Sequence, residues 1–154
     1  MDQLKSLDNY HSSHHRLIRD DLMDLKDKKK MGTCNKVLVV EDNLINQRVA
    51  QLFLKNLGYE ANIAANGQQA LAMFKPDYSL ILMDLGLPDM DGIALAKEIR
   101  KQNKHIPIIA CTASGIAYKE KCFDAGMDDF IVKPMMLEEL KQILDKFLII
   151  KKIN

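Results

Sequence analysis

The chain has 154 residues, and its 22 basic and 21 acidic residues nearly cancel. This length suits one domain with its own core, and the balanced charge gives no overall field that would attract nucleic acid or an anionic membrane. No apolar run approaches the ~20 residues that span a bilayer, and the N-terminus lacks a secretory signal, so we expect a cytoplasmic protein with no membrane contact of its own.

The first 34 residues differ in composition from the rest of the chain. Charged residues dominate there, and Ile18, Leu22 and Leu25 follow a helical spacing. We interpret residues 1–34 either as a charged linker or frayed helix, or as a helix that docks a partner or pairs with its own copy in a homodimer. Residues 35–150 are assigned to one domain, and residues 151–154 to a tail.

From residue 36 onward, strand-like and helix-like patterns alternate. Short apolar runs bounded by turn residues indicate strands covered on both faces, and segments with helical spacing separate them. In chain order we predict a strand at 37–40, a helix at 44–57, a strand at 59–64, a helix at 66–75, a strand at 79–83, a helix at 92–103, a strand at 106–111, a helix at 116–125, a strand at 130–132 and a helix at 136–150.

Five such strand–helix units define the expected fold class. Strands joined through helices of about ten residues require crossover connections and a parallel sheet. The natural arrangement is a flavodoxin-like α/β fold, a doubly wound sheet of strand order 2-1-3-4-5, in which the first and third strands are neighbours.

The chain has three cysteines, and none of them are paired at short spacing. This argues against a disulfide framework and against a zinc site with thiolate ligands, so we expect Cys111 and Cys122 to be small core residues.

Acidic residues follow the two neighbouring strands. Glu41 and Asp42 come directly after the first strand, and Asp84 after the third. The functional crevice of an open α/β sheet lies outside the carboxyl ends of its strands, so these three carboxylates should meet there. Crowded carboxylates need either raised pKa values or a compensating cation. The arrangement therefore predicts a divalent metal site.

Further polar residues end the fourth and fifth strands, namely Thr112 and Lys133. The runs Val-Val-Glu-Asp-Asn, Met-Asp-Leu-Gly-Leu-Pro-Asp-Met-Asp-Gly, Cys-Thr-Ala-Ser and Val-Lys-Pro together resemble the receiver domain of two-component response regulators. The resemblance covers roughly residues 35 to 150. It implies that Asp84 accepts a phosphoryl group from a phosphohistidine, and that the protein is not an enzyme beyond its own phosphorylation and autodephosphorylation.

The same resemblance implies a role for each site residue. Asp42, Asp84 and the backbone carbonyl of Gly86 would bind Mg²⁺, or Mn²⁺ in its place, with Glu41 acting through water. Lys133, before a cis Pro134, would bind a phosphoryl oxygen with help from the Ala113 backbone amide. Thr112 would turn its hydroxyl onto the phosphoryl group, and Phe130, which lacks a phenolic hydroxyl, would follow as the switch aromatic.

A further run of residues after the first strand indicates the class of partner. The run Glu-Asp-Asn-Leu-Ile-Asn-Gln resembles receivers of hybrid histidine kinases, so the partner would be a histidine kinase or a histidine phosphotransfer protein. A phosphatase of the haloacid dehalogenase type would need an acid where Gly86 stands, and a flavodoxin would need a phosphate cradle after the first strand. The serious alternative is a receiver-like module that binds proteins without being phosphorylated.

Overall fold

The computed structural model describes the backbone of residues 35–153 and the side chains of residues 35–148. The predictions for residues 1–34, a linker or a partner-binding helix, lie outside the described residues, and so does Cys34. Within the described part, no helix combines the length and the apolar character needed to cross a bilayer.

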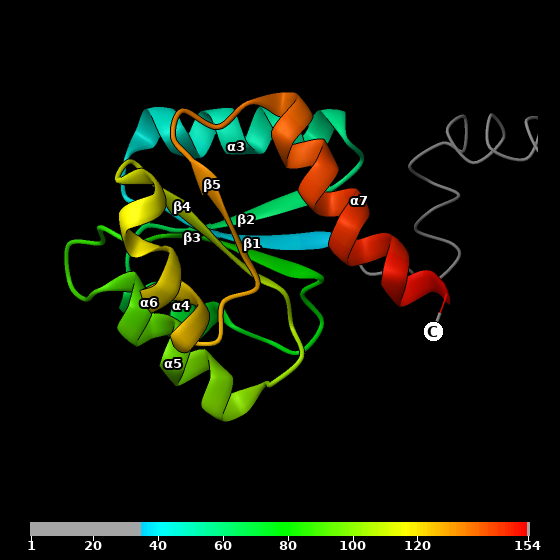
Figure 1. The fold of residues 1–154 in the computed structure, drawn as a ribbon. Helices are drawn as coiled ribbons and strands as arrows, with labels where there is room; N and C mark the ends of the chain where they lie inside the picture. The colour runs from blue at the N-terminus through cyan, green and yellow to red at the C-terminus, as the bar shows by residue number, and fades with distance from the viewer. Residues whose placement is uncertain (1–34, 154) are drawn as a thin grey trace, which may run out of the picture. The chain divides into compact units, whose positions relative to one another are not determined.

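In the described part of the chain, five parallel strands form one sheet in the order β2-β1-β3-β4-β5 (Figure 1). The strands span Lys36–Val40 (β1), Glu60–Ala64 (β2), Leu80–Asp84 (β3), Ile108–Thr112 (β4) and Asp129–Val132 (β5). The predicted order is confirmed, and the register pairs Val40 of β1 with Met83 of β3. The acids that end these two strands therefore emerge at the same edge of the sheet.

Helices cover both faces of the sheet. They span Leu44–Asn56 (α3), Gly67–Met73 (α4), Gly92–Gln102 (α5), Lys119–Asp124 (α6) and Leu137–Ile153 (α7). α3 and α7 lie on one face, and α4, α5 and α6 lie on the other (Figure 1). Buried side chains follow this division, because Leu54 and Leu144 belong to one core cluster and Ala70 and Leu95 to the second.

Strands β3 and β4 are buried along their whole length. Their side chains alternate between the two clusters, with Ile81 on the side of α5 and Leu82 on the side of α3. Burial on both faces explains why these strands appear in the sequence as continuous apolar runs. Cys111 and Cys122 are buried as well, which confirms the prediction that both are core residues.

One predicted helix is replaced in the structure by a 3-10 turn followed by a shorter α-helix. The sequence predicts a single helix at 116–125, but the chain forms a 3-10 turn, η1 (Gly115–Tyr118), before the short helix α6. In neither of these two described segments, η1 and α6, does a side chain accept a hydrogen bond from the first backbone amides. Hydrogen bonds of the 3-10 type commonly form in the first turn of a helix. Gly126, with φ +90°, ends the helix as predicted.

Two helix ends also differ from prediction. α4 ends at Met73 rather than at residue 75, since the backbone of Phe74 is already extended, and Lys75, directly before Pro76, also avoids helical backbone angles. α7 runs to Ile153, past the predicted end at residue 150 and into the segment assigned to a tail. That segment contains two lysines, whose good helix propensity explains the extension.

Candidate functional site

Glu41 lies buried where β1 passes into α3. The Asn43 side chain accepts hydrogen bonds from the Ile45 and Asn46 amides, at 2.9 and 3.1 Å, and thereby caps α3. The Asn43 amide donates to Glu41 Oε1 at 3.1 Å. Gln47 Nε2 donates to the Glu41 carbonyl at 2.7 Å. The N-cap residue of α3 therefore holds the side chain of Glu41, and the first turn holds its backbone.

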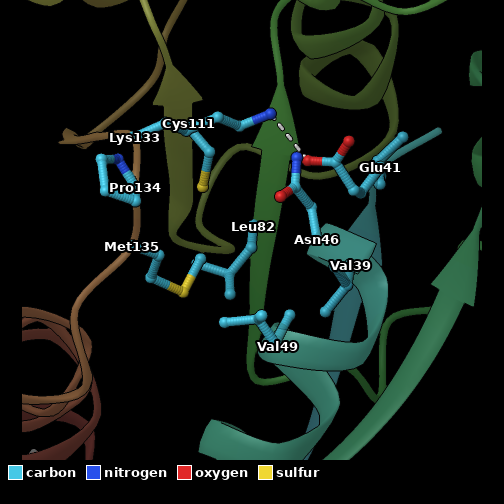
Figure 2. A pocket seen from close by; sticks show the side chains of 11 residues that line it. Val39, Glu41, Asn46, Val49, Leu82, Cys111, Lys133, Pro134 and Met135 are labelled. Carbon is cyan, nitrogen blue, oxygen red and sulfur yellow. Dashed lines mark hydrogen bonds and ion pairs between the residues drawn. The ribbon is translucent and has the colours of Figure 1, made fainter. Parts of the chain in front are cut away.

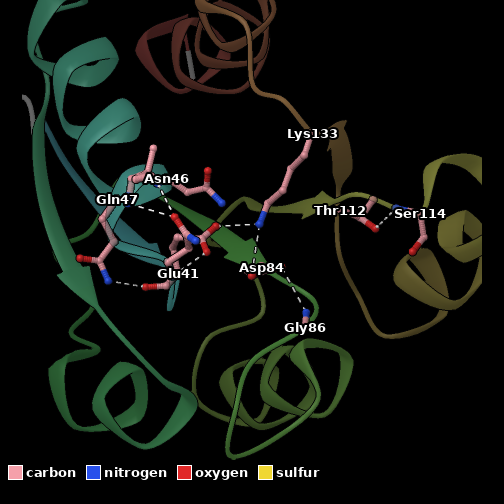
Figure 3. Close-up of polar contacts among 10 residues, drawn as sticks. Glu41, Asn46, Gln47, Asp84, Gly86, Thr112, Ser114 and Lys133 are labelled. Atoms are coloured by element: carbon pink, nitrogen blue, oxygen red, sulfur yellow. Dashed lines mark hydrogen bonds and ion pairs between the residues drawn. The ribbon is translucent and has the colours of Figure 1, made fainter.

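Lys133 joins the acids of two strands (Figure 3). It follows β5, and its bond to Pro134 is cis, as predicted. Lys133 Nζ lies 2.8 Å from Glu41 Oε2 and 3.2 Å from Asp84 Oδ2. Asp84 ends β3, and its Oδ1 accepts a hydrogen bond from the Gly86 amide at 3.1 Å. The fold thus brings the predicted acids of β1 and β3 together with the predicted lysine of β5.

Three carboxylates form an acidic cluster at this edge of the sheet. One oxygen each from Glu41, Asp42 and Asp84 lies within 4.8 Å of the other two. At this spacing a single cation could be shared among all three, and hard oxygen donors of this kind suit Mg²⁺ or Mn²⁺. The donor set therefore fits the metal that the sequence predicts.

Three carboxylates and one lysine leave the cluster with an excess of negative charge. Burial raises the pKa of Glu41, and the hydrogen bond from Lys133 offsets only part of that effect. Burial alone would lower the pKa of Lys133, but its bond to Glu41 and the charge of Asp84 outweigh burial, so the pKa of Lys133 is raised. One lysine does not neutralise the acids around it. A divalent cation would supply the missing positive charge.

Thr112 and Phe130 lie on the same face of the sheet. β4 and β5 pair Ala110 with Phe130, and Thr112 shares the face of Ala110 because side chains alternate along a strand. Thr112 is buried, and its Oγ1 accepts a hydrogen bond from the Ser114 amide at 3.0 Å (Figure 3). Phe130 is half-buried, and Lys119 Nζ lies 5.6 Å from the centre of its ring. Both predicted switch residues therefore face the side of the sheet that α6 covers.

A cavity of about 180 Å³ opens beside the acidic cluster (Figure 2). Leu82, Cys111 and Met135 contribute apolar walls, and Glu41 and Lys133 also line it. Burial raises the pKa of the Cys111 thiol to about 12. The thiol is therefore neutral and behaves as a small apolar group in this wall.

The sequence does not predict the contacts of two further residues, one beside Glu41 and one in the loop after β3. Gln47 holds the Glu41 carbonyl, and Asp89 accepts hydrogen bonds from the Gly67 and Gln68 amides at the start of α4. Asp89 lies 22 residues from Gly67 in the chain. A Pro-Asp pair signals a turn, but a local pattern does not name a partner so far away.

Comparisons with known proteins identify the family to which this fold belongs. The family model of the response regulator receiver domain matches residues 37–145. Hybrid signal transduction histidine kinase K of Dictyostelium discoideum is 42% identical over 123 residues, which cover 73% of this chain and 10% of that protein. Aerobic respiration control sensor protein ArcB of Escherichia coli is 38% identical over 132 residues, which cover 83% of this chain and 17% of that protein.

A solved structure is similar over the same region. The receiver domain of sensor histidine kinase PA1611 from Pseudomonas aeruginosa, with a magnesium ion coordinated in its active-site cleft, is 39% identical with a TM-score of 0.67. The match covers 73% of this chain and 96% of that one. The fold and the acidic cluster thus define a receiver-type α/β domain. The chain belongs to the response regulator receiver domain family, and it spans only a small part of the length of these two relatives.

Proposed function

We propose that this receiver accepts a phosphoryl group on Asp84 and passes the change in charge to its interaction surface. The observation that carries the proposal is the position of Asp84 at the end of β3, 3.2 Å from Lys133 and within the acidic cluster. A carboxylate is a weak nucleophile, so transfer relies on positioning and charge neutralisation. The arrangement around Asp84 offers both.

The proposed transfer replaces one bond to phosphorus with another. An Asp84 carboxylate oxygen bonds to phosphorus while the phosphorus–nitrogen bond of a phosphohistidine breaks and its electron pair returns to the imidazole. Lys133 would then donate to a phosphoryl oxygen as a compact positive charge. The Ala113 amide, directly after β4, would add a second donor, and the Thr112 hydroxyl would leave the Ser114 amide for the new group.

Asp42, Asp84 and the Gly86 carbonyl would hold Mg²⁺ directly, and Glu41 would do so through water, with Mn²⁺ as a substitute. When bound, the cation supplies positive charge that offsets the charge of the transferred group. Support comes from the spacing of the three acids and from the magnesium ion described in the PA1611 receiver.

The similarity to hybrid signal transduction histidine kinase K supports a histidine kinase or a histidine phosphotransfer protein as the partner. In that role the domain is a phosphoacceptor that catalyses only its own phosphorylation and dephosphorylation. A cytoplasmic location and a homodimer stay predictions.

Incubation with acetyl phosphate and Mg²⁺, followed by intact mass, tests this function against the phosphorylation-independent binding module. The unmutated protein should gain about 80 Da, the mass of one phosphoryl group, because the carboxylate forms an acyl phosphate. Excess EDTA should prevent the gain. Undiminished labelling in EDTA would remove the metal from the proposal, and no labelling with Mg²⁺ would favour the binding module.

A further inference from the structure

The loop between β3 and α5 carries the Gly86 carbonyl that we propose as a metal ligand. Its ends are fixed close to the sheet, since a β-bridge pairs Gly86 with Asp91 and the Gly92 amide donates to the Leu85 carbonyl at 3.0 Å. Gly92 permits this approach, because a Cβ there would lie 2.5 Å from the Asp84 carbonyl oxygen. Because the bridge ties Gly86 to Asp91, the position of Gly86 depends on residues 87–90, the loop tip that lies between them.

Asp89 fixes the tip of this loop to α4. Its Oδ1 accepts a hydrogen bond from the Gly67 amide at 2.8 Å, and its Oδ2 accepts one from the Gln68 amide at 2.9 Å. The bonds from Gly67 and Gln68 lower the pKa of Asp89, as expected for a carboxylate that accepts amide hydrogen bonds. Both carboxylate oxygens are thus committed to the first turn of a helix elsewhere in the chain.

The contact is more than a helix cap. The Asn66 side chain already accepts from the Gln69 amide at 2.8 Å, and Gln69 Oε1 accepts from the Ala65 amide at 2.8 Å. α4 therefore has a reciprocal cap from its own segment, similar to a capping box. Because the helix is capped locally, the main consequence of the Asp89 bonds is to locate the loop.

Met90 packs against the same turn of α4. Gly67 is buried, and a Cβ there would lie 2.4 Å from Met90 Cγ and 2.5 Å from Met90 Sδ. Glycine leaves the space that Met90 occupies, and Met90 also packs on the core cluster that contains Leu95. Two consecutive loop residues therefore hold one helical turn, Asp89 through hydrogen bonds and Met90 through packing.

We propose that Asp89 is a positioning residue of the metal site, which sets the place of the Gly86 carbonyl relative to Asp84. This inference rests on the proposed function, in which that carbonyl is a ligand of Mg²⁺. Mg²⁺ demands near-ideal octahedral geometry, so displacing one ligand weakens binding. Bonds outside the ligand shell keep ligands in position. Asp89 itself touches neither the metal nor the reacting atoms.

A titration of the isotope-labelled protein with Mg²⁺, followed through amide chemical shifts without any phosphoryl donor, tests this inference. Asp89→Ala removes both acceptor oxygens and should raise the Mg²⁺ dissociation constant about 10-fold. Asp89→Asn keeps one acceptor oxygen and should give an intermediate value. Gly67→Ala displaces Met90 while alanine favours the helix, and it should also weaken binding.

Asp124→Ala is the matched control, because it removes the same charge from another exposed position and should leave the dissociation constant unchanged. The inference is overturned if Asp89→Ala changes the Gly67 and Gln68 amide shifts but binds Mg²⁺ as tightly as the unmutated protein. It is also overturned if Asp89→Asn keeps the Gly67 and Gln68 amide shifts of the unmutated protein but binds Mg²⁺ as weakly as Asp89→Ala, since lost charge would then be the cause. No saturable Mg²⁺ response in the unmutated protein would overturn the metal site and the inference together.

Discussion

Glu41 and Asp42 are adjacent in sequence but differ in what they can offer a cation. Both side-chain oxygens of Glu41 have partners, Oε1 the Asn43 amide at 3.1 Å and Oε2 Lys133 at 2.8 Å. Asp42 is exposed, and its carboxylate reaches the same cluster. The contrast favours Asp42 as a direct ligand and Glu41 as a residue that acts through water.

Asp42→Asn should therefore weaken Mg²⁺ binding more than Glu41→Gln does. Each variant loses one negative charge, so the difference between them reports direct ligation. The Mg²⁺ concentration that gives half-maximal phosphorylation by acetyl phosphate measures the effect. A larger increase in Glu41→Gln than in Asp42→Asn would contradict the assignment of the direct ligand.

The Cys111 thiol should be unreactive in the folded protein, although it lines the cavity beside the site. Burial raises its pKa to about 12, and only the thiolate is an effective nucleophile. Iodoacetamide should leave Cys111 unmodified from about pH 7 to about pH 9, with full modification in urea, as read by peptide mass. If labelling of Cys111 in the folded protein instead rises with pH, solvent reaches the cavity and the thiol ionises there.

At the scale of elements, Arg100 ties the end of α5 to the opposite edge of the sheet. Its Nε donates to the Gly126 carbonyl at 2.8 Å, and Nη1 donates to the Ile106 carbonyl at 2.7 Å. Nη2 lies 2.9 Å from Asp128 Oδ2. The Arg100 side chain is only 16% exposed and the Asp128 side chain 39%, so the bonds to the two carbonyls are better shielded from water than the ion pair. One guanidinium thereby joins α5, the segment before β4 and the turn before β5.

Arg100→Ala should lower the free energy of unfolding by about 3 kcal/mol, because it leaves poorly hydrated carbonyls and Asp128 without their donor. Lys101→Ala is the matched control. Its ion pair with Glu98 has side chains 70% and 50% exposed, and such surface pairs contribute about 0.5 kcal/mol. Urea unfolding measures both. Equal effects of the two substitutions would mean that the Arg100 contacts contribute no more than a surface pair.

The strands and their order were predictable because burial on both faces leaves a simple signal, as in Leu80–Asp84 and Ile108–Thr112. Helix boundaries were less predictable. The 3-10 turn at Gly115–Tyr118 arises from hydrogen bonding in an uncapped first turn, which periodicity does not report. The extension of α7 to Ile153 depends on a balance of propensities across a charged segment.

At the scale of the whole molecule, the acidic site was predictable from topology. Parallel strands deliver their carboxyl ends to one edge, so Glu41 and Asp84 had to meet once β1 and β3 were neighbours. The supporting contacts were not predictable. The simultaneous pairing of Lys133 with two acids and the bonds of Asp89 to α4 depend on loop paths, and residue spacing does not determine these.

Thr112→Ala should leave phosphorylation largely intact but uncouple it from the surface formed by α6, β5 and α7. Phosphorylation would draw the Thr112 hydroxyl from the Ser114 amide, the ring of Phe130 would move into the vacated space, and one pre-existing state would be favoured. Amide chemical shifts across residues 112–145 measure this coupling. If phosphorylation changes the amide shifts of Thr112→Ala as it does those of the unmutated protein, the coupling runs through residues other than Thr112 and Phe130.

Intact mass after incubation with acetyl phosphate and Mg²⁺ shows whether the phosphoryl group is on Asp84, when Asp84→Asn is compared with the unmutated protein. An amide forms no acyl phosphate, so Asp84→Asn should lack the gain of about 80 Da that the unmutated protein shows. Asp124→Asn, an exposed acid on α6, is the matched control and should be labelled normally. A labelled Asp84→Asn protein would contradict the assignment of Asp84 as the phosphoacceptor.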